Sequence, residues 1–320
     1  MGTLTQRTIL VTGGTGFIGS HVVEQLLKQQ CRVISTSIEH DPRSYFQTQQ
    51  MNRHVQTIFA DVTNYTRMAS VIGSNDIDYI IHLAAQPLVE TAYRYPRETF
   101  LTNIMGTVNI LEAARHTPSI RGILIASSDK AYGKKKTDYT ESDPLQGDHP
   151  YESSKSSADL VAQTYVKTYH MPIVITRFGN VYGPGDLNTD RIVPGIMHAV
   201  LTNTELVIRS DGTYVRDYCY IRDIARATVE LLEHIGTTRG EAFNISSDDT
   251  YSVIDLLKKT ESILKKKIAY RITNTAQNEI PRQSLSYDRI RKTIGWKPKY
   301  TLQTGLIETF AWYRKYICLL

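Results

Sequence analysis

Cysteine is scarce in this chain, which has only Cys31, Cys219 and Cys318 among its 320 residues. Their number is odd and they lie far apart, so they match neither a disulfide-rich secreted protein nor the paired spacing of a zinc site. We therefore expect no bound metal. The hydrophobic fraction of 41% is large enough to form a core without such cross-links.

Long apolar runs and a strong charge of one sign are also missing. No apolar stretch approaches the roughly 18 residues of a membrane helix, and the first residues lead into a strand and a glycine turn instead of a signal peptide. The 37 lysines and arginines exceed the 32 aspartates and glutamates by only +5, spread along the chain. This composition argues against nucleic-acid and membrane partners and predicts a cytoplasmic protein.

Short β-branched runs alternate with helical stretches over residues 8–178. The expected strands are Thr8–Thr12, Arg32–Ser37, Gln56–Ala60, Tyr79–His82, Arg121–Ala126 and Pro172–Phe178. Strands that alternate with helices are joined by right-handed crossovers, which predicts an α/β protein with a Rossmann-type doubly wound parallel sheet. We assign residues 1–178 to this domain. Residues 179–320 are assigned mainly to a smaller mixed α/β lobe, with some segments returning to the first domain.

A glycine-rich turn joins the first expected strand to the first helix. Gly13, Gly16 and Gly19 have the spacing of a dinucleotide-binding turn, and Phe17 and Ile18 open the helix. Glycine permits the tight turn, the close approach of backbone to a pyrophosphate and the close packing of the helix on the sheet. The positive end of the helix then favours phosphate groups. We expect these five residues to contact a dinucleotide.

Further cofactor contacts are expected where the third and fourth strands end. Asp61 and Val62 close the third strand, where a carboxylate can accept a hydrogen bond from an adenine amino group. Leu83, Ala84 and Ala85 close the fourth strand, and their small size lets a cofactor lie against the strand end. These positions follow from the strand order alone.

The second strand ends at Ser37, where an acidic residue usually binds the ribose 2′-hydroxyl of NAD. Serine forms a weaker hydrogen bond than a carboxylate. Arg43 follows six residues later and could accept the 2′-phosphate of NADP. These two residues leave NAD and NADP both open.

Candidate catalytic residues form two groups. Tyr151 and Lys155 lie four residues apart at the start of a long amphipathic helix, so they share one face. A free phenol has a pKa near 10, which a neighbouring ammonium and a cationic nicotinamide would lower, allowing Tyr151 to remove a hydroxyl proton. Ser128, Asp129 and Lys130 follow the fifth strand at the edge where doubly wound sheets bind ligands. Simple alcohol oxidation does not need the added acid and base.

These segments together resemble the extended short-chain dehydrogenase/reductase family, and within it the nucleotide-sugar dehydratases and epimerases. The resemblance covers nearly the whole chain and is closest to the CDP-glucose 4,6-dehydratases. The segments that carry it are His82–Val89, Thr99–Asn103, Met105–Asn109, Ser128–Lys130, Tyr151–Lys155, Gly179–Val181, Gly185–Asp186, Ser37–Pro42 and Gly295–Pro298.

The resemblance implies NAD as the cofactor and a nucleotide-diphosphate sugar as the substrate. Combined with the patterns above, the expected cofactor contacts are Gly13, Gly16, Phe17, Ile18, Gly19, Ser37, Asp61, Val62, Leu83, Ala84, Ala85, Asn103, Ser127, Tyr151 and Lys155. The expected catalytic residues are Ser128, Asp129, Lys130, Tyr151 and Lys155. The expected substrate contacts are Gln86, Ser128, Asn180, Arg191, Arg216 and Arg282. Arginine suits a diphosphate because its planar fork pairs with phosphate oxygens.

Two positions depart from the pattern of the CDP-glucose enzymes. Gly212–Tyr218 has the general dehydratase and epimerase form without the expected tryptophan, and Ser127 stands where threonine is common. The nucleotide base and the sugar therefore stay open.

We hypothesise an internal redox cycle that yields a 4-keto-6-deoxy sugar and water. Tyr151 takes the proton of the 4-hydroxyl, Lys130 removes the proton at carbon 5, and Asp129 assists the leaving 6-hydroxyl, although the last two roles can be exchanged. The alternative is a nucleotide-sugar 4-epimerase of the UDP-glucose or UDP-glucuronate type, which needs no acid–base pair. A protein that binds NAD or a nucleotide sugar without turnover is a more remote alternative. The resemblance also implies a homodimer formed through helices near residues 96–116 and 151–170.

Overall fold

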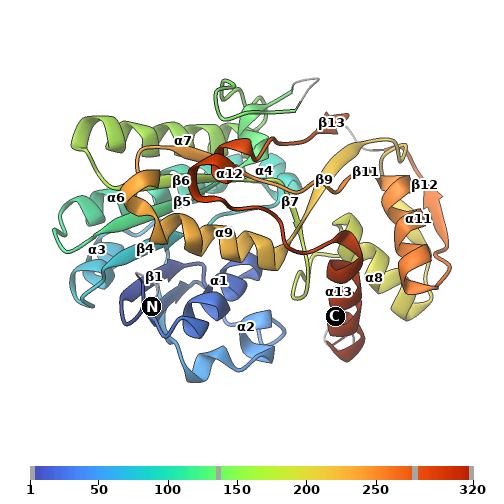
Figure 1. Cartoon of the computed structure of the whole chain (residues 1–320), viewed down its shortest axis with the longest axis horizontal. Helices are drawn as coiled ribbons and strands as arrows, with labels where there is room; N and C mark the ends of the chain where they lie inside the picture. Colours follow the sequence, from blue (N-terminus) through green and yellow to red (C-terminus); the bar gives the residue numbers. More distant parts are fainter. Residues whose placement is uncertain (1–3, 135–137, 276–279, 317–320) are drawn as a thin grey trace.

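The computed structural model describes residues 4–134, 138–275 and 280–316, so Cys318 lies outside the described residues. Its centre is a seven-stranded parallel sheet in the order β10-β6-β5-β4-β1-β2-β3 (Figure 1). The strands are β1 (Thr8–Thr12), β2 (Arg32–Ser37), β3 (Gln56–Phe59), β4 (Tyr79–His82), β5 (Gly122–Ser128), β6 (Ile173–Phe178) and β10 (Ala242–Ile245). This sheet confirms the predicted fold class, and β10 at its edge comes from beyond residue 178.

The predicted fifth strand was too short at its carboxyl end. β5 continues through Ser127 and Ser128 because these residues still pair in register with Arg177 and Phe178 of β6. The two serines are therefore the last residues of the strand instead of the first residues of a loop. Their positions are fixed by the sheet, which matters for any chemistry at this edge.

Helices cover both faces of the sheet because successive strand side chains point to opposite sides. Ile9 and Val11 of β1 pack into one core with α1 (Phe17–Lys28) and α9 (Ile221–Glu233), whereas Leu10 between them packs into the other. The second core is covered by α3 (Tyr65–Gly73), α6 (Gly106–Arg115) and α7 (Pro150–Tyr169) (Figure 1). Short elements complete this part of the chain: α2 (Tyr45–Thr48), η1 (Met51–Arg53), α4 (Val89–Arg94) and α10 (Ile235–Thr238).

The helix expected near residues 96–116 contains a π-helical turn. It runs from α5 (Pro96–Phe100) through η2 (Leu101–Met105) into α6. A π turn inserts an extra residue into the helical ladder and is often found at functional sites. Here it includes the buried Asn103.

A second lobe lies to the right of the large sheet in Figure 1. It contains one sheet of β11 (Thr250–Ser252), β9 (Val215–Tyr220), β13 (Arg282–Gln283) and β7 (Asn180–Tyr182), and a pair formed by β8 (Leu206–Ile208) and β12 (Tyr270–Ile272). Its helices are α8 (Ile192–Thr202), α11 (Val253–Leu264) and α13 (Leu302–Tyr316), while α12 (Asp288–Ile294) packs near β10. Ile196, Leu256 and Trp312 belong to the same core as α1 and α9, so a continuous apolar interior joins the lobe to the sheet.

A buried ion pair fixes α7 against the sheet. Arg177 of β6 donates to both carboxylate oxygens of Asp159 on α7, at 2.8 and 3.0 Å, and also to the hydroxyl of Tyr132 at 2.8 Å. Arg177 and Asp159 are both buried. A bidentate pair of this kind specifies one orientation of the helix that begins with Pro150 and Tyr151.

Within the described part of the chain, none of the helices combines the length and the apolar character needed to cross a membrane.

Candidate active site

The glycine turn after β1 has the geometry that its sequence predicts. Gly13 has a φ of +68°, and a Cβ added to it would lie 3.0 Å from the backbone of Ala84. A Cβ on Gly19 would lie 2.1 Å from the carbonyl oxygen of Gly13, which is far inside van der Waals contact. Side chains at both positions are therefore excluded. Gly16 caps α1, whose first turn carries no acidic residue, so the helix end stays favourable for an anion.

The other predicted cofactor residues line the same carboxyl edge of the sheet. Ser37 ends β2, and its hydroxyl accepts a hydrogen bond from Thr15 at 2.9 Å. Asp61 lies exposed beyond β3, where its carboxylate accepts from the backbone N–H of Thr63 at 2.8 Å. Val62, Leu83, Ala84, Ala85 and Ser127 lie buried or half-buried beside them. The hydroxyl of Ser127 is buried and has no hydrogen-bond partner among the described residues, as expected of a group that meets a ligand.

Asn103, in the π turn, connects two predicted parts of the site. Its side-chain oxygen accepts from the backbone N–H of Gln86 at 2.8 Å, and its amide donates to the Gln86 carbonyl at 3.1 Å and to Ser154 at 2.9 Å. Ser154 lies on α7 between Tyr151 and Lys155. The side chain of Gln86 is hydrogen-bonded to the backbone of Leu88 and to the hydroxyl of Thr99.

Tyr151, Ser128 and Lys155 come together at the end of β5. Tyr151 is buried and hydrogen-bonded to Ser128, whose hydroxyl donates to a carboxylate oxygen of Asp129 at 2.9 Å. Lys155 donates to the carbonyl oxygen of Ala126 at 3.1 Å. The Tyr–Lys pair and the serine are thus brought to one place from α7 and β5.

The predicted lowering of the Tyr151 pKa by Lys155 is not seen in the protein alone. Burial raises the pKa of Tyr151 to about 12, and the negative charge of Asp129 adds to this, against smaller lowering effects of Ser128 and Arg191. Burial also lowers the pKa of Lys155 to about 8, which still leaves most of this amine protonated at neutral pH. Lys155 is not among the groups that shift the pKa of Tyr151, and burial is the largest influence on it. The lowering of this pKa by the lysine together with a cationic nicotinamide therefore stays a prediction.

Asp129 and Lys130 point inward beside this group. Asp129 is 3% exposed, and the amino nitrogen of Lys130 lies 3.6 Å from one of its carboxylate oxygens. Burial lowers the pKa of Lys130, and Arg216 lowers it further, while Asp129, Glu152 and Asp217 raise it. A lysine that loses its proton more readily than usual can act as a base near neutral pH. The other oxygen of Asp129 is already occupied by Ser128.

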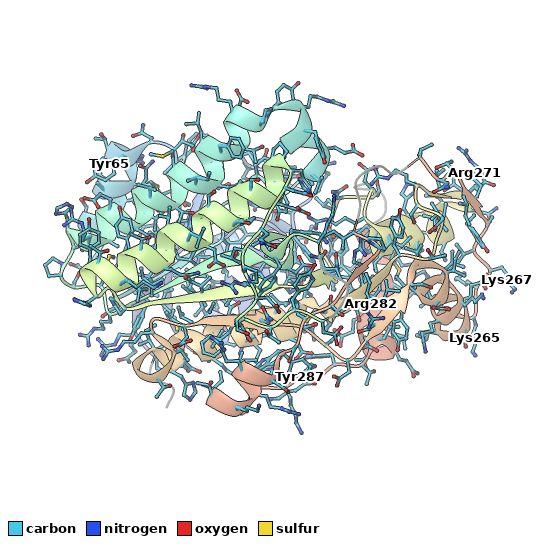
Figure 2. The ribbon with its side chains drawn as sticks, turned by 90° about the horizontal axis from the view of Figure 1, so that it is seen from above. Tyr65, Lys265, Lys267, Arg271, Arg282 and Tyr287 are labelled. Atoms are coloured by element: carbon cyan, nitrogen blue, oxygen red, sulfur yellow. The ribbon has the colours of Figure 1, made fainter. Side chains whose placement is uncertain are left out.

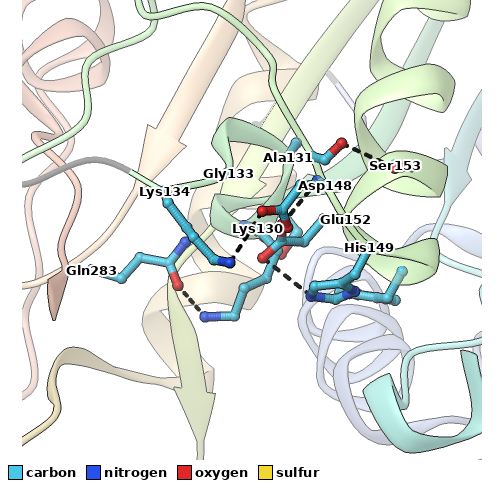
Figure 3. A network of polar contacts seen from close by, with 12 residues as sticks. Lys130, Ala131, Gly133, Lys134, Asp148, His149, Glu152, Ser153 and Gln283 are labelled. Carbon is cyan, nitrogen blue, oxygen red and sulfur yellow. Dashed lines mark hydrogen bonds and ion pairs between the residues drawn. The ribbon is translucent and has the colours of Figure 1, made fainter. Parts of the chain in front are cut away.

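Two residues of this site were missed from the sequence. Gln283 of β13 accepts a hydrogen bond from the amino group of Lys130 (Figure 3). Its side-chain amide also donates to the carbonyl oxygen of Asp129 at 3.0 Å. Asp217 of β9 is buried close enough to Asp129 for their charges to interact. Neither contact has a signal in the sequence, because each joins the residues that follow β5 to a strand about 90 or 150 residues later.

A second layer of polar contacts surrounds Lys130 on the α7 side. The carboxylate of Glu152 is 1% exposed and lies 3.1 Å from a ring nitrogen of His149. Glu152 also accepts from the backbone N–H of Asp148 at 3.2 Å, and Asp148 pairs with Lys134 at 3.1 Å (Figure 3). These contacts tie the segment before α7 to the loop that follows Lys130.

Asp217 makes the stability of the protein depend on pH. Burial, followed by the charge of Asp129, raises the pKa of Asp217 to about 6, although hydrogen bonds from Ser246 and Leu285 oppose the shift. A carboxyl group with a raised pKa stabilises the fold below its unfolded pKa, and this contribution is lost as the pH rises through about 6. Two pKa units correspond to roughly 3 kcal/mol.

We expect Asp217→Asn to remove this pH dependence, since the amide oxygen can still accept hydrogen bonds. Urea unfolding at several pH values between about 4.5 and 7.5 measures the effect. The variant should gain stability relative to the wild type as the pH rises through this window. A difference between the two proteins that stays constant with pH would contradict the assignment.

Asn180, Arg191, Arg216 and Arg282 are the residues expected to contact the nucleotide diphosphate, and three of these four line one cavity of the second lobe. The cavity has a volume of about 540 Å³, and Asn180, Arg191 and Arg216 are among its lining residues. Arg191 also pairs with the buried Asp186 at 3.1 Å. The charges of Arg191 and Arg216 act on Tyr151 and Lys130 respectively, so this cavity lies near the candidate catalytic residues.

Arg282 does not line this cavity. Its side chain is half exposed and lies 3.6 Å from Asp138, and Figure 2 shows it between the lobes, away from Lys265, Lys267 and Arg271 at the far end of the second lobe. The reason is strand alternation: on β13 the neighbouring Gln283 points inward, so Arg282 faces the opposite side. Arg209 does line the cavity and pairs with Glu90 of α4, a contact not expected from the sequence.

Among the described residues there is no group of three histidine, cysteine or acidic side chains arranged to hold a metal ion. Cys31 and Cys219 are buried free thiols.

Comparison with known proteins places this arrangement among enzymes of nucleotide sugars. Residues 10–309 match the sequence profile of the family described as GDP-mannose 4,6 dehydratase. The chain is 28% identical to dTDP-D-glucose 4,6-dehydratase of Homo sapiens over 97% of its own length and 90% of that protein. It is 25% identical to CDP-glucose 4,6-dehydratase of Salmonella typhimurium, over 97% of this chain and 91% of that protein.

Among solved structures, the fold is similar to that of a UDP-glucuronic acid 4-epimerase from Bacillus cereus, determined with UDP-glucuronic acid and NAD. The TM-score is 0.88 at 29% sequence identity, covering 96% of this chain and 99% of that one. The relatives thus include both dehydratases and epimerases, so the choice between these reactions depends on the residues of the site.

Proposed function

The chain belongs to the GDP-mannose 4,6 dehydratase family, and from this premise we propose that it is an NAD-dependent nucleotide-sugar 4,6-dehydratase. It converts a nucleotide-diphosphate hexose into the 4-keto-6-deoxyhexose and water. The observation that carries the proposal is the inward-facing pair of Asp129 and Lys130 beside Tyr151 and Ser128. A 4-epimerase needs the tyrosine and serine but has no use for a second acid and base.

The residues at the sheet edge fit a bound dinucleotide. Gly13 and Gly19 leave no room for a side chain, α1 presents its amino end, and Ser127 has a buried hydroxyl without a hydrogen-bond partner in the described part of the chain. When bound, NAD supplies an electron acceptor for carbon 4 of the sugar and returns the electrons at carbon 6. We propose that Ser37, Asp61, Asn103 and Lys155 complete its binding site.

The environment of Arg43 supports NAD as the cofactor over NADP. Arg43 donates to both carboxylate oxygens of Asp41, each at 3.0 Å, so its guanidinium is already paired. A 2′-phosphate would have to compete with this carboxylate, whereas a 2′-hydroxyl needs no cation.

In the oxidation step, Tyr151 accepts the proton of the 4-hydroxyl while Ser128 holds that hydroxyl in place. The pKa of about 12 that the protein alone gives Tyr151 is too high for an efficient base at neutral pH. The positive charge of oxidised NAD is the remaining source of lowering, so we propose that Tyr151 becomes a competent base only when the cofactor is bound.

In the elimination step, the new 4-ketone acidifies the hydrogen at carbon 5. Neutral Lys130 takes that proton, the bond between carbon 6 and oxygen breaks, and protonated Asp129 gives its proton to the departing oxygen to form water. The pair is then Lys130 ammonium and Asp129 carboxylate. Lys130 gives its proton back to carbon 5 when carbon 6 is reduced. The proton that Tyr151 took from the 4-hydroxyl returns to Asp129 through the hydroxyl of Ser128, which is hydrogen-bonded to both, so all three groups regain their starting states.

The cavity of the second lobe is suited to the nucleotide part of the substrate. Arg191 and Arg216 provide cations for the diphosphate, and Asn180 has a side-chain N–H without a hydrogen-bond partner in the described structure. We propose that residues 1–178 hold the cofactor and residues 179–320 mainly hold the nucleotide. The Ser128-Asp129-Lys130 segment resembles that of CDP-glucose enzymes, so CDP-glucose is the first substrate to test.

We also propose that the protein forms a homodimer through α6 and α7. Leu160 and Tyr169 on α7 are each about half exposed, at 51% and 49%, on a helix whose other face covers the sheet. Burying these side chains against a second copy would remove apolar area from water.

The test is turnover of glucose nucleotides deuterated at carbon 4. Purified protein is incubated in turn with the CDP, GDP, UDP and dTDP forms, and the products are analysed by mass spectrometry and NMR. We expect loss of one water, with the deuterium found at carbon 6 of the same molecule. Unchanged mass with inversion at carbon 4 would replace the dehydratase by an epimerase. Tight NAD binding without turnover of any of the four would favour a binding protein.

A further inference from the structure

We propose that Gln283 is a positioning residue for the elimination step, which aims the amine of Lys130 and keeps it able to lose its proton. The proposal rests on the dehydratase function above. Gln283 comes from β13 of the second lobe, yet its side chain contacts the two residues that follow β5. The elimination site is therefore completed by a side chain that lies outside the Rossmann domain.

The side chain of Gln283 is held in place from several directions. It is completely buried, and its strand pairs in register with β9, where Gln283 lies opposite Arg216. Two residues further on, the backbone N–H of Leu285 donates to Asp217 at 3.2 Å. On the other side, the carbonyl oxygen of Ser284 accepts from the backbone N–H of Tyr139 at 2.9 Å.

The orientation of the Gln283 amide follows from its partners. A carbonyl oxygen can only accept, so the group that meets the Asp129 carbonyl at 3.0 Å must be the NH₂ of Gln283. The amide oxygen therefore faces Lys130 and accepts from its amino group. One N–H of Lys130 is thereby directed at Gln283 in either charge state. When the amine is neutral, its lone pair must point elsewhere, which leaves it available to a substrate hydrogen.

The neutrality of Gln283 is the second part of the argument. The charged groups around Lys130 are Asp129 from η3 (Asp129–Tyr132), Glu152 from α7, and Arg216 and Asp217 from β9. The three acids favour the ammonium, while burial and Arg216 oppose it. An uncharged acceptor orients the amine without adding a fourth negative charge. A glutamate of the same shape would add that charge and hold the proton on Lys130.

The test uses two variants of Gln283 and measures the oxidation at carbon 4 and the elimination of water separately. Oxidation is followed by the absorbance of reduced nicotinamide, and proton removal by exchange of the carbon 5 hydrogen in D₂O. For Gln283→Leu we expect oxidation close to that of the wild type, with carbon 5 exchange and water loss slowed by about 10²-fold, as for a misplaced catalytic group. For Gln283→Glu we expect the rise of the elimination rate with pH to move upward by about one to three units.

Ser284→Ala is the matched control. Ser284 lies in the same buried segment and donates to Asp138, without touching Lys130. It should leave both half-reactions and the pH profile unchanged. Slowing of oxidation and elimination by the same factor in Gln283→Leu, or an unmoved pH profile in Gln283→Glu, would overturn the proposal. If the wild type eliminates no water from any nucleotide sugar, the proposed function itself fails, which is a different outcome.

Discussion

Lys130→Met should stop the reaction after the first oxidation. Methionine preserves the length of the lysine side chain but has no proton acceptor at its end, so the carbon 5 proton stays in place. General acid–base catalysis contributes about 10²- to 10⁴-fold, and we expect water loss to fall within this range. Oxidation at carbon 4 should persist, because Tyr151 and Ser128 are unchanged. Reduced nicotinamide and the 4-keto hexose should therefore accumulate on the protein.

This result distinguishes the two enzymatic readings of the site. An epimerase would tolerate Lys130→Met, since inversion at carbon 4 needs no base at carbon 5. The measurement combines product mass with the absorbance of the reduced cofactor in a single turnover. Lys134→Met serves as the control, because Lys134 is nearby but 45% exposed and paired with Asp148 at the surface. Full water loss in Lys130→Met would remove the lysine from the mechanism.

Tyr151→Phe should abolish both steps. The phenylalanine keeps the ring in its buried site but cannot take the 4-hydroxyl proton, so the ketone never forms and carbon 5 is never acidified. We expect turnover to fall by about 10²- to 10⁴-fold, with no accumulation of reduced nicotinamide and no carbon 5 exchange. This pattern differs from that of Lys130→Met, in which the first step survives.

The control for Tyr151→Phe is Tyr165→Phe on the same helix. The hydroxyl of Tyr165 donates to Glu112 at 3.1 Å, far along α7 from the catalytic end. Nucleotide-sugar affinity, measured by calorimetry, should be nearly the same in both variants and in the wild type. If Tyr151→Phe retains oxidation, the base must be another group, and the role given to Tyr151 is wrong.

Local patterns were sufficient to predict six of the seven strands of the large sheet, all except β10, and the turn after β1. The glycine turn was predicted because the positive φ of Gly13 and the close approach of Gly19 to Gly13 both arise among residues that are near each other in the sequence. The strands were predicted because a buried parallel strand is a short apolar run of β-branched residues. The end of β5 was misplaced, since Ser127 and Ser128 have no strand propensity of their own and extend the strand only by pairing with β6.

The sequence by itself determined which residue types stand at the ends of the strands, and hence the class of chemistry. Only the tertiary structure decided that Gln283 reaches Lys130, that Arg282 beside it turns away, and that burial raises the pKa of Tyr151. The physical reason is the separation along the chain between the residues that interact. Backbone turns and strand patterns depend on neighbouring residues, whereas burial and polar contacts depend on how segments about 150 residues apart pack against each other.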